Sequence, residues 1–121
     1  MDQMLKTSLS EVVKSIPGAV GAILADWEGE AVEQVGHMDS YELKVAGAYS
    51  GVILSLLRQI SERLDKQELE EIVIGTALAQ VLVMPVSREY FLVVVLRKDA
   101  LLGKALYETR GCALRLKDEV A

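Results

Sequence analysis

The sequence has few of the residues on which catalytic and metal sites depend. It holds one cysteine, Cys112, and one histidine, His37. A disulfide within the chain is therefore impossible, and the paired Cys and His ligands of a zinc site are missing. A serine or threonine nucleophile needs a base, and His37 lies in a predicted loop. We expect no catalytic, metal or cofactor residues and a chain that is not an enzyme, with Cys112 as a packed helical residue rather than a reactive thiol.

Basic residues are also in the minority. Thirteen Lys and Arg stand against 18 Asp and Glu, for a formal net charge of −5. Nucleic acid is not an expected partner, because phosphate binding depends on clustered basic side chains. The longest apolar runs, 81–86 and 90–96, are far shorter than the about 20 residues that span a bilayer. No signal peptide pattern precedes them, so we expect no membrane span and a cytoplasmic protein.

What the sequence does contain is apolar residues in regular patterns, with 51% hydrophobic and 26% charged residues in 121. This balance is typical of one globular domain, here 1–121. Helical spacing over 1–16 ends at Pro17 and Gly18. The run 19–25 is almost continuously apolar, as in a central strand, and 31–35 follows a predicted turn at 26–29 as its hairpin partner.

The second half of the chain repeats this alternation of helix and strands. Asp39, with Glu42 three residues later, predicts the start of a long helix over 40–64, and 65–70 forms a polar connection. Strands are predicted at 71–76, 79–84 and 90–97, and Asp99 can cap a last helix. The order α-β-β-α-β-β-β-α indicates an α/β domain of the α+β type, with a five-stranded antiparallel sheet flanked by three helices.

The helix over 40–64 carries non-charged residues around most of its circumference, more than a monomer needs. We expect its most apolar sector to pack on its own sheet: Val45, Tyr49, Val52, Ile53, Leu56, Ile60 and Leu64. A neighbouring strip mixes small residues with leucine and predicts the interface of a homodimer: Leu43, Gly47, Ser50, Leu54, Leu57 and Ser61. The alternative is that the helix lies deep in its own core.

A third strip of the same helix has small residues in the middle and charges at its ends, which is a candidate surface for a partner protein: Lys44, Ala48, Gly51, Ser55, Arg58 and Glu62. The alternative is a solvated helix face. Trp27, in the predicted turn, is either a further partner-binding residue, as exposed aromatics often are, or an indole folded back against a helix end.

Several segments, in order, resemble the Roadblock family, which includes dynein light chains. They are Ile-Pro-Gly-Ala-Val-Gly-Ala-Ile-Leu-Ala-Asp-Trp-Glu-Gly at 16–29, the small-residue-rich helix at 40–64, the strand at 72–74, Val-Met-Pro at 83–85, and Tyr-Phe-Leu-Val-Val-Val at 90–95. The resemblance implies a homodimer in which edge strands join into one sheet and the long helices pack side by side. It also implies a scaffold or regulator of a Ras-like small GTPase, as in bacterial MglB-type regulators, which stimulate GTP hydrolysis by their partner.

The chain itself has no phosphate-binding motif, because Gly18 and Gly21 lack the later glycine and lysine of such a loop. We therefore expect a binding partner for a GTPase and not a GTPase. The alternative is a ligand-sensing module that holds a small metabolite between sheet and helix.

Overall fold

The computed structural model describes residues 2–64 and 68–120, so residues 65–67 of the predicted connection lie outside the described residues. The order of elements is the predicted one and the fold class is confirmed. The bounds are α1 (Asp2–Ser15), β1 (Ala19–Asp26), β2 (Ala31–Gly36), α2 (Ser40–Arg63), β3 (Ile72–Gly75), β4 (Ala79–Pro85), β5 (Tyr90–Arg97) and α3 (Leu102–Val120).

The five strands form one antiparallel sheet in the order β2-β1-β5-β4-β3. The two most continuously apolar segments, β1 and β5, lie at its centre and are buried on both faces. Strands β2 and β3 are the edges. Strand β3 has only four residues and alternates between half-buried and exposed positions, so one edge of the sheet is short and open to solvent.

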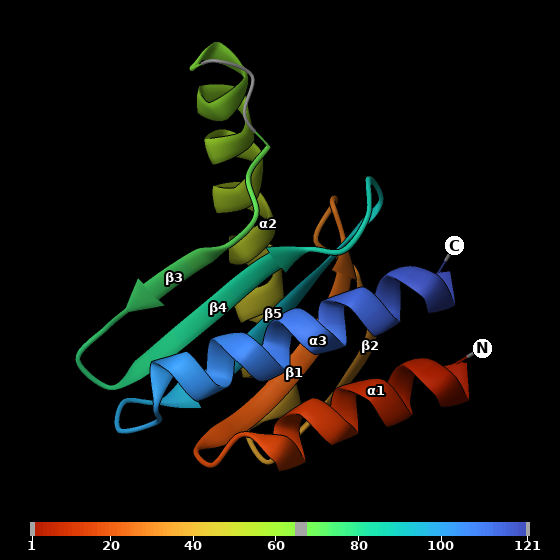
Figure 1. Ribbon diagram of the computed structural model, residues 1–121, viewed down its shortest axis with the longest axis vertical. Coiled ribbons are helices and arrows are strands. Elements are labelled where there is room, and N and C mark those ends of the chain that lie inside the picture. The colour runs from red at the N-terminus through yellow and green to blue at the C-terminus, as the bar shows by residue number, and fades with distance from the viewer. Residues whose placement is uncertain (1, 65–67, 121) are drawn as a thin grey trace.

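Helices cover the two faces of the sheet unequally. Figure 1 shows α1 and α3 side by side on one face and α2 alone on the other. The first core lies between α1, α3 and the sheet and includes Leu9, Leu24, Leu92 and Leu116. The second lies under α2 and is built around Phe91. Because α2 packs chiefly on β1, the half of this face that β3 and β4 form lies to one side of the helix.

The predicted start of α2 is confirmed, whereas that of α3 is wrong. Asp39 is the N-cap of α2, and its Oδ2 accepts a hydrogen bond from the backbone N–H of Glu42 at 3.0 Å. Asp99, by contrast, lies in the turn after β5, where it pairs with Arg97 at 3.5 Å. Helix α3 begins three residues later, at Leu102, and the carbonyl of Leu101 accepts its first hydrogen bond, from Ala105.

The prediction of which sector of α2 packs on the sheet is also wrong. The five buried residues of the helix are Leu43, Gly47, Ser50, Gly51 and Leu54. The sector expected to be buried is instead turned outward: six of its seven residues are 37% to 69% exposed. We call these six the apolar ridge: Tyr49, Val52, Ile53, Leu56, Ile60 and Leu64.

Small residues decide this orientation, because they let the helix backbone come close to the sheet. A Cβ on Gly47 would lie 3.2 Å from Cδ1 of Ile23, on β1, and one on Gly51 would lie 3.2 Å from Cζ of Phe91, on β5. Such distances are shorter than ordinary van der Waals contact, so larger side chains would push α2 outward. The glycines of α2 thus serve packing within the chain.

Beyond Leu54, α2 extends past the sheet. Figure 1 shows its C-terminal turns rising above the strands, next to the chain segment that returns to β3. The apolar side chains of these turns, Leu56, Ile60 and Leu64, are 57%, 51% and 65% exposed. The structure therefore positions a row of large apolar residues where the chain's own sheet does not reach them.

Candidate functional site

The turn between β1 and β2 is the first component of the candidate site, and its own sequence fixes it. Oδ1 of Asp26 accepts hydrogen bonds from the backbone N–H groups of Glu28 and Glu30, both at 3.0 Å. Gly29 closes the turn at φ +90°, a conformation that other residues rarely adopt. Gly29 packs closely against α2, because a Cβ at this position would lie 3.3 Å from Cα of Ala48. The turn thus rests directly on the helix.

Trp27, the second component, joins three elements. Its ring lies edge-on to Phe91 with the centroids 5.7 Å apart, and its Nε1 donates a hydrogen bond to the carbonyl of Ser87 at 3.4 Å. The guanidinium carbon of Arg58, on α2, lies 3.8 Å from the ring centroid. A cation over an indole face contributes about 0.5–1 kcal/mol at exposed sites. The indole is thus half-buried against Phe91 and α2, and its role in binding a partner stays a prediction.

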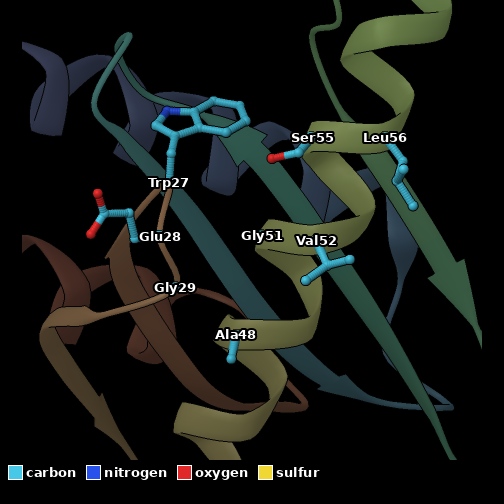
Figure 2. A pocket seen from close by; sticks show the side chains of 8 residues that line it. All are labelled: Trp27, Glu28, Gly29, Ala48, Gly51, Val52, Ser55 and Leu56. Carbon is cyan, nitrogen blue, oxygen red and sulfur yellow. The ribbon is translucent and has the colours of Figure 1, made fainter.

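A slot lies between this turn and α2, with a volume of about 230 Å³. Figure 2 shows Trp27 and Glu28 on one side and the side chains of α2 on the other. The small residues Gly29, Ala48 and Gly51 form its base, and its lining is completed by Trp27, Glu28, Val52, Ser55 and Leu56. Its size suits a single apolar side chain rather than a metabolite, whose sites usually measure about 300–1,000 Å³.

The residues predicted to bind a partner therefore come together from two distant segments. Trp27 lines the same slot as Ala48, Gly51 and Ser55 of the third strip, and Arg58 of that strip lies over its ring. The glycine among them is buried beneath Phe91 and Gly29, so its small size serves a contact within the chain. Lys44 and Glu62 are exposed on α2 on either side of this group.

The residues predicted to form a dimer interface lie elsewhere than expected. Leu43, Gly47, Ser50 and Leu54 are buried inside the chain, because the small residues pack on β1 and β5. They leave no surface for a second copy. Leu57 and Ser61, farther along α2, are half-buried. The apolar surface that α2 does present is the apolar ridge.

Cys112, on α3, is fully buried, as the sequence predicts, and its Sγ lies 3.6 Å from the carbonyl oxygen of Ser8 on α1. Burial raises the pKa of its thiol from 9.0 to about 11, against a smaller lowering by Arg115. The reactive form of a thiol is the thiolate. The structure thus places this group in the core and not at a reactive site.

We predict that Cys112 in the folded protein reacts very slowly with iodoacetamide at pH 8. Its pKa of about 11 leaves about a hundredfold less thiolate than the ordinary value of 9.0, and burial slows access further. Mass spectrometry over time should show labelling that accelerates as the pH rises toward 11, and rapid labelling in 6 M guanidinium. Equal rates in the folded and unfolded protein would contradict the placement of Cys112.

The described residues form neither a metal-binding group nor a membrane-spanning helix. Among residues 2–64 and 68–120, no three His, Cys, Asp or Glu side chains are grouped so that they could hold a metal ion. Within the same residues, no helix is both long and apolar enough to cross a membrane.

The molecule is therefore a small α+β domain whose sheet is covered by one helix on one face and by two on the other, with an exposed apolar ridge on the single helix. Its family follows from comparison: residues 5–96 match the model of the Roadblock/LC7 domain. The chain belongs to the Roadblock/LC7 family, and the sequence resemblance is confirmed.

Solved structures of this family share the fold. The gliding protein MglB from Thermus thermophilus superimposes with a TM-score of 0.89 at 18% identity, over 99% of this chain and 92% of that one. An MglB structure with a tetrameric arrangement gives a TM-score of 0.88 at 18% identity, over 97% and 88%. MglC from Myxococcus xanthus is 28% identical with a TM-score of 0.69, over 96% and 98%. No curated protein sequence matches the chain.

Some surfaces of the domain could not be identified by sequence reasoning. The partners of Trp27 at Ser87 and Phe91 are about 60 residues away along the chain, and no local signal connects them. The apolar ridge did have a signal. Tyr49, Ile53, Leu56 and Ile60 follow the alternating spacing of four and three residues that is typical of a helix seam between two helices.

Proposed function

We propose that the protein is a homodimeric scaffold or regulator that binds a Ras-like small GTPase and can stimulate its GTP hydrolysis. The observation that carries this proposal is the apolar ridge: six large side chains, each more than a third exposed, of which five lie on α2 and the sixth, Leu64, is its C-cap. Contiguous apolar surface of this kind on a soluble domain marks an interaction site. Membership of the Roadblock/LC7 family and the fold shared with MglB support the same function.

The second copy is the expected occupant of the ridge, because the neighbouring part of the sheet is uncovered as well. Ile72 and Ile74, on β3, are opposite Val83 and Val81, and therefore point to the same face as α2. Both isoleucines are only half-buried. A two-fold arrangement that pairs the β3 edges would extend the sheet and bring two α2 helices together over this face. One interface would then cover the edge, the isoleucines and the ridge.

The docking surface for the GTPase is proposed to be the slot with its surroundings: Trp27, Lys44, Ala48, Gly51, Ser55, Arg58 and Glu62. The slot offers space for one apolar side chain, and the Arg58 guanidinium, held over Trp27 at 3.8 Å, supplies a positive charge beside it. Hydrophobic anchors flanked by oriented charges are typical of specific protein interfaces. In a two-fold dimer the surface would be present twice.

A bulky charged side chain in the slot tests this surface. We expect Ser55→Arg to weaken binding at least about tenfold, because it fills the slot and adds a charge to be desolvated. Ser55→Ala is the matched control and should bind like the wild type. Calorimetry would use the Ras-like GTPase encoded nearest to this gene, loaded with a non-hydrolysable GTP analogue, and GTP turnover would provide a second readout. Equal affinities for all three proteins would exclude the slot as the docking surface.

Arg58 is a less suitable probe than the sequence suggests. An exposed arginine could be replaced by glutamate without cost to stability. In the structure Arg58 stacks on Trp27, so Arg58→Glu would remove a contact of about 0.5–1 kcal/mol and loosen the turn as well. A loss of binding in that variant would combine two causes. Ser55 avoids this problem, since its side chain faces the slot (Figure 2).

A further inference from the structure

The two edges of the sheet differ in how far their backbone groups are free to pair with another strand. In β2, the backbone N–H of Gln34 lies on the open side of the strand, since hydrogen bonds to β1 alternate from the one between His37 and Val20. Oε1 of Glu33 accepts a hydrogen bond from this N–H at 3.1 Å. A carboxylate on an edge amide hinders the addition of another strand. Among the described residues, no side chain caps the edge of β3 in this way.

The free backbone groups of β3 follow from its pairing with β4. The N–H of Thr76 donates a hydrogen bond to the carbonyl of Ala79 at 2.9 Å, and hydrogen-bonded pairs alternate along an antiparallel ladder. The two isoleucines of β3 are therefore bonded to β4, whereas the N–H and C=O groups of Val73 and Gly75 point outward. A strand of four residues thus offers only two outward residues to a second copy.

Glu71 is the next residue whose backbone belongs to this edge, and its hold on the domain comes from α3. The ladder between β3 and β4 begins only at Ile72. The side chain of Glu71 reaches Arg110 on α3, whose Nη2 and Nε donate hydrogen bonds to its Oε1 at 2.7 and 3.1 Å. Helix α3 covers the face of the sheet opposite α2 (Figure 1). This ion pair therefore ties the start of the edge to the far side of the sheet.

A two-fold pairing of the β3 edges makes use of the backbone of Glu71. Residues opposite each other in an antiparallel pair point to the same face. Both α2 helices therefore lie on one face only when Val73 is opposite Val73 of the second copy, or when the strands are shifted from there by two residues. In the first register Glu71 lies opposite Gly75 of the second copy. Each of these registers adds Glu71 to the two outward residues of β3, and does so twice in a two-fold dimer.

We propose that Arg110 is a positioning residue for self-association: its ion pair with Glu71 holds the start of the β3 edge in line with the strand, so that the edge of the free chain is ready to pair with a second copy. This inference rests on the proposed homodimer and on its pairing of β3 edges. Ordering the edge before association lowers the entropy cost of binding. The dimer therefore gains affinity from Arg110, which acts through Glu71.

Removal of either member of the ion pair tests this role. Arg110→Ala and Glu71→Ala should each raise the Kd of the dimer about tenfold in sedimentation velocity, since every dimer loses two of these contacts. The double variant should be no weaker than either single variant, because both substitutions remove the same contact. The charge-swapped protein, Arg110→Glu with Glu71→Arg, should regain most of the affinity.

Lys104 and Glu108 provide the matched control. Their ion pair, at 3.3 Å, lies within α3, and its side chains are 49% and 25% exposed, close to the 57% and 25% of Arg110 and Glu71. Lys104→Ala should dimerise like the wild type. Melting curves of all variants, recorded at a dilution where the chains are monomeric, should match that of the wild type, because exposed ion pairs contribute little to folding.

Two further measurements distinguish positioning from a direct contact with the second copy. The higher Kd of Arg110→Ala should come mainly from slower association, since only chains with the edge in place can pair. Loss of a direct contact would instead act mainly on the dissociation rate. In about 0.5 M NaCl the Kd of the wild type should approach that of the variant, because salt weakens exposed ion pairs.

The possible results separate this role from the homodimer itself. An unchanged Kd for Arg110→Ala, a double variant whose loss is the sum of the two single losses, or a change confined to the dissociation rate would overturn the role of Arg110 and leave the homodimer intact. A wild-type protein that sediments as a monomer at about 100 μM would overturn both. Equal losses in the single and double variants, with recovery in the charge-swapped protein, would establish the positioning role.

Discussion

Truncation of Leu54 to alanine is expected to lower the free energy of unfolding by about 2–5 kcal/mol. Leu54, on the sheet-facing side of α2, is fully buried in the core that includes Phe91. Removing its side chain loses apolar burial and leaves a cavity that the close-packed sheet cannot fill. Urea denaturation followed by circular dichroism would measure the loss as a lower midpoint with an unchanged slope.

Leu56 provides the matched control, since it is the same residue type two positions away. It is 57% exposed, so Leu56→Ala should change the unfolding free energy by less than about 1 kcal/mol when the protein is diluted enough to dissociate any dimer. Compared with each other, the two variants show which side of α2 packs on the sheet. A larger cost for Leu56→Ala than for Leu54→Ala would show that the helix packs on the sheet with the opposite sector.

The rotation of α2 is the feature of the fold that the sequence could not determine. The apolar ridge and the buried residues of α2 are both uncharged and follow helical spacing, so periodicity alone does not distinguish the exposed side of the helix from the buried side. The most apolar sector is the natural choice for the core, yet this sheet accepts the helix only where Gly47 can approach Ile23. That fit depends on side chains of β1 and β5, which are distant along the chain.

Features that depend on neighbours in sequence were predicted well. The cap at Asp39 requires only the N–H of Glu42, and the turn at Asp26 requires only Glu28, Gly29 and Glu30. The central strands β1 and β5 were visible because strands buried on both faces are continuously apolar. The failure at Asp99 has a local cause as well, since a capping residue type also suits the turn that it occupies.

In the candidate site, too, the residues could be identified from the sequence, whereas the contacts between distant segments could not. Trp27 and the third strip were both identified as partner-binding candidates, but nothing in the sequence indicated that they adjoin one another. Their contact arises because Gly29 and Gly51 allow the turn to rest on α2, where a Cβ on Gly51 would lie 3.8 Å from Cα of Gly29. The stacking of Arg58 on the indole follows from that approach. Contacts of this kind require the folded arrangement.

A charge in the middle of the apolar ridge should separate the proposed dimer into folded monomers. Leu56 lies near the centre of the ridge, and Leu56→Glu would place a carboxylate where two α2 helices meet. Burying a charge without a partner costs several kcal/mol, and each 1.4 kcal/mol corresponds to about a tenfold change in Kd. We expect Kd to increase by about a hundredfold or more, which sedimentation velocity would show as a monomer at concentrations where the wild type is dimeric.

The fold itself should tolerate this change, because in the single chain the side chain of Leu56 is 57% exposed and a helix accepts glutamate as readily as leucine. The melting curve of the variant should therefore match that of the diluted wild type. Leu101→Glu is the control: Leu101 is 76% exposed but precedes α3, far from the ridge along the chain, and should leave the dimer intact. A Leu56→Glu protein that still sediments as a dimer with the wild-type Kd would show that the ridge contacts something other than a second copy. The GTPase would then become the next candidate for its partner, since the slot beside Trp27 shares Leu56 with the ridge.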